Sequence, residues 1–136
     1  MMTGDDLRRY ERRHGRIPRG ALVCMDSGWV AKVGDPLAFK GGAAFPNHRF
    51  PGLSEERRCG LRSGETITGI GVDTISLDPG NSTTFPVRVN FLATDRYGLE
   101  GVNNLDRIPP KGAVADVGLI PWEEGSGGSC RVIASW

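Results

Sequence analysis

Two short apolar runs constrain the fold more than any other feature of this sequence. Residues Ala21–Met25 form an unbroken apolar run between turn signals, and Thr68–Asp73 forms a second run that contains two glycines. Continuous rather than alternating apolar character is typical of a strand that is covered on both faces. Gly69 and Gly71 would let a neighbouring backbone approach closely. The sequence therefore predicts two buried strands.

Glycine and proline divide the rest of the chain into short elements. The 136 residues include 20 glycines and 9 prolines, so we expect many turns. Residues 33–51 carry repeated glycines and prolines without a sustained period of either kind, which predicts a long loop. The total length fits one domain, residues 1–136.

Three segments carry helix signals. Thr3 and Asp6 have the spacing of a capping box, and Gly15 is suited to end the helix that follows. Ser54 precedes two acidic residues, the pattern of an N-cap and a first helical turn. Pro86 can occupy the first turn of a third helix.

Strand signals return in the last third of the chain. Leu99–Val102 predicts a short strand, whereas Ala113–Ile120 and Cys130–Ala134 predict a strand pair joined across Glu123–Ser129. The glycine-rich run 125–128 lacks the Lys-Ser/Thr ending of a phosphate-binding loop and leads into a strand. We therefore interpret it as a hairpin connection.

Charge and hydropathy exclude several classes of partner. Lys and Arg number 17 and Asp and Glu number 16, so no overall field favours nucleic acid or an anionic membrane. The arginines at positions 8, 9, 12 and 13 are more simply a solvated helix face than a nucleic-acid patch. No apolar stretch or leader pattern is present, and we expect a cytoplasmic protein.

The three cysteines do not suggest a disulfide framework or a zinc knuckle. Cys24, Cys59 and Cys130 are an odd number and lie far apart in the sequence. We expect reduced and mostly buried thiols.

A series of short motifs runs along nearly the whole chain. In order, they are Gly15–Pro18, Ser27–Trp29, Phe50–Ser54, Gly71–Gly80, Phe85–Val87, Leu99–Glu100, Asn104–Asp106, Pro109–Ala113, Gly127–Gly128 and Arg131–Ala134. Each is weak alone, but together they resemble the cyclase family of metal-dependent hydrolases, which includes kynurenine formamidases and isatin hydrolases.

The resemblance implies both a fold and a reaction. The implied fold class is α/β (α+β), a swivelling β/β/α cyclase-like fold with a mixed sheet and short helices, here truncated to a C-terminal portion. The implied reaction is arylformamidase-like hydrolysis of small aromatic or cyclic amides, with water activated by Zn or Mn.

The resemblance also implies metal ligands, and most of them are missing. Glu100 stands where the family has a late glutamate ligand, but Arg88 stands where a histidine is expected. A guanidinium keeps its proton and offers no lone pair to a metal. The family's N-terminal His-x-x-x-His-x-Asp motif is absent, since the only histidines are His14 and His48. The resemblance thus implies Zn or Mn as the cofactor, and the alternative is that this chain binds no metal.

Several residues remain candidates for a binding site. We expect Arg88 to pair with Glu100 and take the place of the lost metal, although a surface carboxylate is the simpler interpretation of Glu100 alone. Trp29, His48 and Arg88 are the candidate substrate-binding residues. For Trp29 a packing role and for His48 an exposed loop position are the alternatives. Three further polar residues are expected to fix the turn after the second strand: Asp73, Ser76 and Asp78.

Three interpretations of function follow. The chain is a hydrolase completed by another chain or by unexpected ligands, or a non-catalytic descendant that keeps a small-molecule pocket, or an interaction module. In the last two cases uncovered strand edges and apolar surface favour association, and we expect a homodimer.

Overall fold

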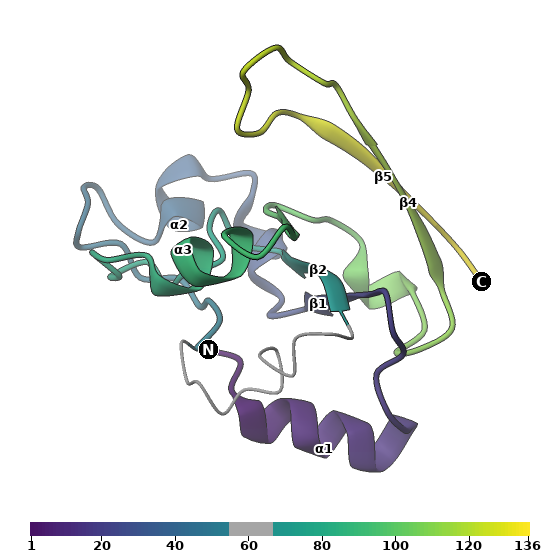
Figure 1. The fold of residues 1–136 in the computed structure, drawn as a ribbon. Helices are drawn as coiled ribbons and strands as arrows, with labels where there is room; N and C mark the ends of the chain where they lie inside the picture. Colours follow the sequence, from purple (N-terminus) through teal and green to yellow (C-terminus); the bar gives the residue numbers. More distant parts are fainter. Residues whose placement is uncertain (55–66) are drawn as a thin grey trace. The chain divides into compact units, whose positions relative to one another are not determined.

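The computed structural model describes residues 1–54 and 67–136. The chain divides into two compact units, Met1–Leu105 and Asp106–Trp136, and Figure 1 draws both as a ribbon. Our expectation that residues 1–136 act as one domain stays a prediction.

A parallel sheet organises the first unit. Its strands are β1 (Ala21–Met25), β2 (Ile67–Val72) and β3 (Tyr97–Leu99), in the order β1-β2-β3. The two predicted buried strands are present and pair directly, with Val23 opposite Ile70. Strand β2 is mainly buried, as predicted. Strand β1 is less buried than predicted: four of its five residues are half-buried, because it lies at the edge of the sheet. The third strand is displaced from the predicted Leu99–Val102, because it ends at Leu99 and shares only that residue with the prediction.

Helices precede and follow the strands of this unit. The helical segments of this unit are α1 (Gly4–His14), η1 (Trp29–Lys32), α2 (Pro36–Lys40) and α3 (Pro86–Leu92). A further short helix, η3 (Leu105–Arg107), begins at the last residue of this unit and continues into the second. The predicted capping box is present: both the backbone N and the hydroxyl of Thr3 donate to Oδ2 of Asp6, at 2.9 and 2.8 Å. Gly15 ends α1 with a φ of 81°, as expected. The helix predicted to begin after Ser54 lies outside the described residues.

Helix α2 corrects the prediction of a continuous loop over residues 33–51. Asp35 caps it by accepting hydrogen bonds from the backbone N of Leu37 and Ala38, at 2.9 and 3.1 Å. Pro36 fills the first turn, and Gly41 ends the helix in the left-handed conformation with a φ of 68°. These start and stop signals outweigh the lack of an apolar period in so short a helix.

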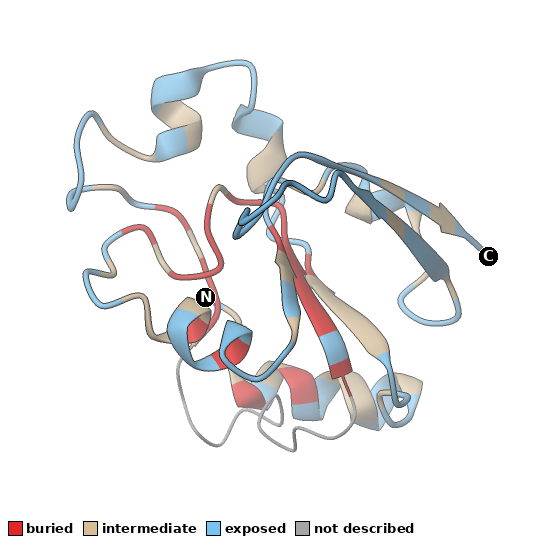
Figure 2. Cartoon of the chain, turned by 45° about the horizontal axis from the view of Figure 1, so that its top comes forward, coloured by how far each residue is buried: buried red, intermediate tan, exposed pale blue. Residues whose placement is uncertain are grey.

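The core of the first unit forms around the central strand (Figure 2). Its buried members are Met25, Leu53, Ile67, Ile70, Val72, Leu77, Val87 and Phe91. Two loops meet beside this core: the backbone N of Leu53 donates to the carbonyl of Leu77 at 2.8 Å. At Gly52 an added Cβ would lie 2.4 Å from the backbone N of Pro79. The absence of a side chain there lets the two loops touch.

The second unit contains an antiparallel strand pair. Strand β4 (Val114–Leu119) pairs with β5 (Cys130–Ser135), with Val117 opposite Val132. The predicted hairpin over residues 113–134 is therefore present, and the glycine-rich run lies in its connection. None of the helices in the two described ranges is both long and apolar enough to span a bilayer.

The cysteines are less buried than we predicted. Cys24 is half-buried, Cys130 is exposed, and Cys59 lies outside the described residues. Cys130 is exposed because it begins an antiparallel ribbon of only two strands, which offers little cover within its own unit.

Thiol reactivity should separate Cys24 from Cys130. Burial raises the pKa of Cys24 to about 11, so at pH 8 only about one thiol in a thousand is the reactive thiolate. We expect iodoacetamide at pH 8 to label Cys130 readily and Cys24 only after denaturation, with peptide mass mapping as the measurement. Cys130→Ser provides the control, and labelling of Cys24 in the native protein at the rate of Cys130 would contradict the structure.

Candidate functional site

Buried polar residues gather immediately after the central strand. Strand β2 ends at Val72, and Asp73, Thr74, Ser76 and Asp78 follow it, all buried. In open parallel sheets the carboxyl ends of the strands are where binding sites commonly form. Polar side chains in this position need hydrogen-bond partners, and those partners define the site.

Asp73 joins the segment after β1 to the end of β2. Its Oδ1 accepts from the backbone N and the hydroxyl of Ser27, at 3.2 and 2.6 Å. Its Oδ2 accepts from the backbone N of Trp29 at 2.6 Å and of Val30 at 3.4 Å. We expected Asp73 to fix its own turn, but its partners lie 43 to 46 positions earlier. This carboxylate is a structural link at the base of the site.

Asp78 caps helix α3 from a distance in the sequence. Its carboxylate accepts from the backbone N of Val87 at 2.8 Å and of Arg88 at 3.1 Å. Phe85, at the N-cap, provides no side-chain cap, and Pro86 has no N–H to donate. A buried carboxylate at a helix N-terminus is also favoured by the helix dipole. Asp78 thereby fixes the backbone of Arg88.

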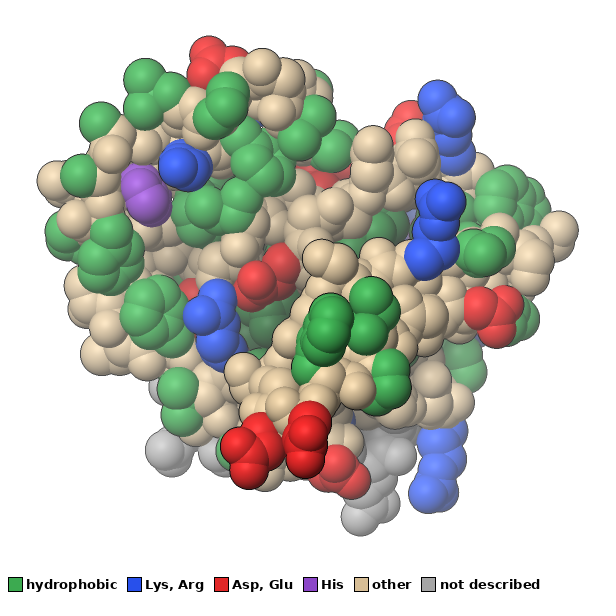
Figure 3. All heavy atoms as spheres, turned by 90° about the horizontal axis from the view of Figure 1, so that it is seen from above, with side chains coloured by type: hydrophobic (Ala, Val, Ile, Leu, Met, Phe, Trp, Pro, Cys, Tyr) green, Lys and Arg blue, Asp and Glu red, His purple; other side chains and the backbone are tan. Residues whose placement is uncertain are grey.

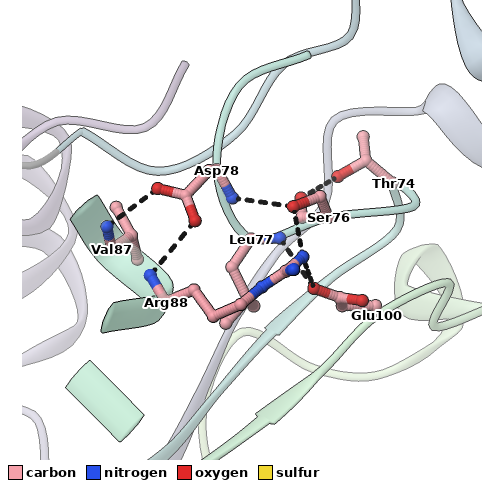
Figure 4. Close-up of polar contacts among 7 residues, drawn as sticks. All are labelled: Thr74, Ser76, Leu77, Asp78, Val87, Arg88 and Glu100. Carbon is pink, nitrogen blue, oxygen red and sulfur yellow. Dashed lines mark hydrogen bonds and ion pairs between the residues drawn. The ribbon is translucent and has the colours of Figure 1, made fainter. Parts of the chain in front are cut away.

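Arg88 and Glu100 form the predicted ion pair (Figure 4). Nη2 of Arg88 lies 3.0 Å from Oε1 of Glu100 and donates to Oγ of Ser76 at 2.9 Å. Oε1 of Glu100 also accepts from the backbone N of Leu77, at 3.2 Å. Because the side chains are 41% and 37% exposed, the pair itself adds less than about 1 kcal/mol to stability. Its significance is the placement of an accessible cation.

Aromatic rings lie beside the arginine. Cζ of Arg88 lies 5.4 Å from the centroid of the Phe85 ring, and this ring stacks on Phe45 at 5.9 Å. His48 contacts Phe45 edge-on, with the ring centroids 6.3 Å apart. Two predicted binding residues, Arg88 and His48, are thus linked by two phenylalanines that the sequence analysis did not single out. Figure 3 shows hydrophobic side chains gathered around a histidine on one face of the molecule.

Trp29 makes its contacts elsewhere. Nε1 of its indole donates to the carbonyl of Phe39 at 2.8 Å, and Nζ of Lys32 lies 3.2 Å from the ring centroid. The residue is half-buried. These contacts fit the packing role that we considered as an alternative, and a substrate contact by Trp29 stays a prediction.

The residues of this site do not fit a zinc or manganese centre. Arg88 has no lone pair to offer, and Oε1 of Glu100 already accepts hydrogen bonds from Arg88 and Leu77. Tight sites for these metals need three or more protein ligands. In residues 1–54 and 67–136 no three His, Cys, Asp or Glu side chains are grouped for such a role. The described part of the chain offers a fixed cation where the resemblance implies a metal.

Comparison with known proteins gives a consistent result. The Cyclase family model matches residues 1–79. An isatin hydrolase of Roseibium aggregatum is 32% identical over 139 residues, covering 98% of this chain and 52% of that protein. This chain therefore spans about half the length of the curated relative that it matches.

Solved structures of isatin hydrolases have the same fold. Isatin hydrolase A from Ralstonia solanacearum has a TM-score of 0.88 at 37% identity. An isatin hydrolase bound to the product analogue thioisatinate has a TM-score of 0.89 at 28% identity. In both cases 98% of this chain and 52% of the solved chain are covered. The predicted α/β cyclase-like fold is confirmed, and the chain belongs to the cyclase family.

Proposed function

We propose that this chain binds small aromatic or cyclic amide compounds at the Arg88–Glu100 site and does not hydrolyse them by itself. The observation that carries the proposal is the 3.0 Å contact between Arg88 and Glu100. It joins the two positions at which the resemblance implies a histidine and a glutamate that share a metal.

The chemistry of arginine supports binding rather than turnover. A metal in such a hydrolase supplies two effects, polarisation of the carbonyl and a lowered pKa of the attacking water. The guanidinium of Arg88 can supply the first effect, because its N–H groups donate to a carbonyl oxygen. It does not supply the second, because it binds water only through hydrogen bonds and stays protonated.

A hydrolase completed by another chain is the alternative that the comparisons favour. This chain spans 52% of the length of its isatin hydrolase relative, so residues of a second chain could contribute ligands next to Glu100. Under this alternative Zn or Mn would bind only in the assembled protein.

An interaction module is the alternative that the second unit favours. One face of the β4–β5 ribbon is entirely apolar, since the residues on it are Ala115, Val117, Leu119, Cys130, Val132 and Ala134. A two-stranded ribbon is marginally stable alone, and cover by a second copy would make the expected homodimer. Light scattering distinguishes the dimer from the monomer.

Incubation of the purified chain with isatin tests the proposed function. We expect saturable binding in a calorimetric titration, and no loss of the cyclic amide over the spontaneous rate with ZnCl₂ or MnCl₂ added. Chromatography of the reaction mixture measures the loss. Turnover that scales with protein concentration and disappears in Glu100→Ala would contradict the proposal and favour the hydrolase.

A further inference from the structure

We infer that Arg88 and the rings beside it form a site that prefers the ring-opened, anionic form of an aromatic amide over the neutral cyclic amide. The inference rests on the proposed function and adds the charge state that the site selects. Hydrolysis breaks the C–N bond of a cyclic amide: the water oxygen bonds to the carbonyl carbon, one proton of the water goes to the nitrogen, and the other is released to the solvent. The product carries an aromatic amine and an ionised carboxylate, so it has a negative charge that the substrate lacks.

Arg88 has hydrogen-bond donors left for such a carboxylate. Its Nη2 donates to Ser76 and to Glu100, at 2.9 and 3.0 Å. Within the described ranges neither Nη1 nor Nε makes a hydrogen bond, and 41% of the side chain is exposed. Hydrogen bonds from a guanidinium to a carboxylate are stronger than those to a neutral carbonyl. The open donors of Arg88 therefore favour the anion.

The guanidinium is held in place before any ligand arrives. The backbone N of Arg88 donates to the buried Asp78, and its Nη2 donates to Ser76, which follows the central strand. Figure 4 shows the arginine side chain extending from α3 toward Ser76 and Glu100. A side chain that is already ordered loses less conformational entropy on binding.

The aromatic part of the ligand has a surface beside this cation. The centroid of the Phe85 ring lies 5.4 Å from Cζ of Arg88, and this ring stacks on that of Phe45. Phe45 is 53% exposed, so its ring is open to a ligand. Offset stacking and edge contacts on such rings stabilise an added aromatic ring. A ligand whose carboxylate binds Arg88 and whose ring packs on the two phenylalanines is an aromatic carboxylate.

The backbone of Phe85 supports a binding role for its ring. Phe85 has a φ of 47° and a ψ of 49°, the left-handed region that a bulky residue rarely adopts. Strain of this kind clusters at ligand-binding and catalytic sites, where the surrounding structure maintains it. Here it places the ring next to Arg88.

Glu100 competes with a ligand for the same cation. Its carboxylate lies 3.0 Å from Nη2 of Arg88, so a bound anion must share the guanidinium with it. Glu100→Gln removes the competing charge and keeps an oxygen that can accept from the backbone N of Leu77. Since an exposed pair contributes little, the gain in anion affinity is bounded at about fivefold.

Calorimetric titration of isatin and isatinate, at pH 8 with EDTA present, tests the inference. We expect isatinate to bind at least about tenfold more tightly than isatin. Arg88→Gln should weaken the binding of isatinate by about 10- to 100-fold and remove the preference. Glu100→Gln should strengthen the binding of isatinate. Arg96→Gln is the matched control, because Cζ of Arg96 lies at a similar 5.2 Å from the ring of Phe91. Circular dichroism confirms that each variant is folded.

Each outcome of the titration has a distinct meaning. Tighter binding of isatinate that depends on Arg88 but not on Arg96 supports the inference. Equal or tighter binding of isatin overturns the anion preference and leaves the proposed binding function standing. Failure of both compounds to bind overturns the proposed function as well. A loss of isatinate affinity in Glu100→Gln would overturn the competition between Glu100 and the ligand, because it would mean that Glu100 positions Arg88 for binding.

Discussion

Replacement of Asp73 by alanine is expected to lower the free energy of unfolding by about 3–4 kcal/mol. The buried carboxylate accepts hydrogen bonds from Ser27, Trp29 and Val30. A hydrogen bond to a charged group contributes about 1.5–3 kcal/mol, but bonds that share one carboxylate are not additive, and removal of one buried charged partner costs about 3–5 kcal/mol in total. Urea denaturation followed by circular dichroism measures the change.

Asp26 provides the matched control for Asp73. It lies in the segment after β1 that Asp73 contacts, is exposed, and accepts one hydrogen bond from the backbone N of Gly28 at 3.1 Å. We expect Asp26→Ala to cost less than about 1 kcal/mol. If the two variants lost equal stability, Asp73 would not be the link between β1 and β2 that its contacts describe.

Replacement of Asp78 by alanine is expected to affect both stability and binding. Val87 and Arg88 would lose the acceptor for their backbone N–H groups, at a cost of about 2 kcal/mol. Helix α3 would then no longer hold Arg88 beside Ser76, so affinity for isatinate should fall several-fold. Denaturation gives the first quantity and calorimetry the second.

Asp35 is the matched control for Asp78, because it caps the short helix α2 through two similar hydrogen bonds, at 2.9 and 3.1 Å. Asp35→Ala should cost about 1 kcal/mol without changing isatinate binding. A fall in affinity in both variants would mean that binding responds to general destabilisation rather than to the position of Arg88.

Local patterns were sufficient to predict much of the fold. The apolar runs predicted β1 and β2, the capping box predicted α1, and Pro86 predicted the start of α3. Each of these signals is contained within a few neighbouring residues. Helix α2 was missed although Asp35 and Gly41 carry equally local signals, because we gave more weight to the absence of an apolar period in residues 33–51.

The candidate site was predicted only in part. The Arg88–Glu100 pair was expected because the resemblance brings these positions together, and the two side chains do meet. The roles of Asp73 and Asp78 and the stacking of Phe45 on Phe85 were not predicted. Such contacts join segments far apart in the chain, so no periodicity or cap signal encodes them.

The central claim is that a cation of the protein occupies the position of a metal, and elemental analysis tests it most directly. The purified chain would be incubated with Zn²⁺ or Mn²⁺ and dialysed before its metal content is measured. We expect well below one metal per chain, unchanged in Glu100→Ala, because Arg88 has no lone pair and Glu100 is its partner. One metal per chain that is lost in Glu100→Ala would contradict the claim.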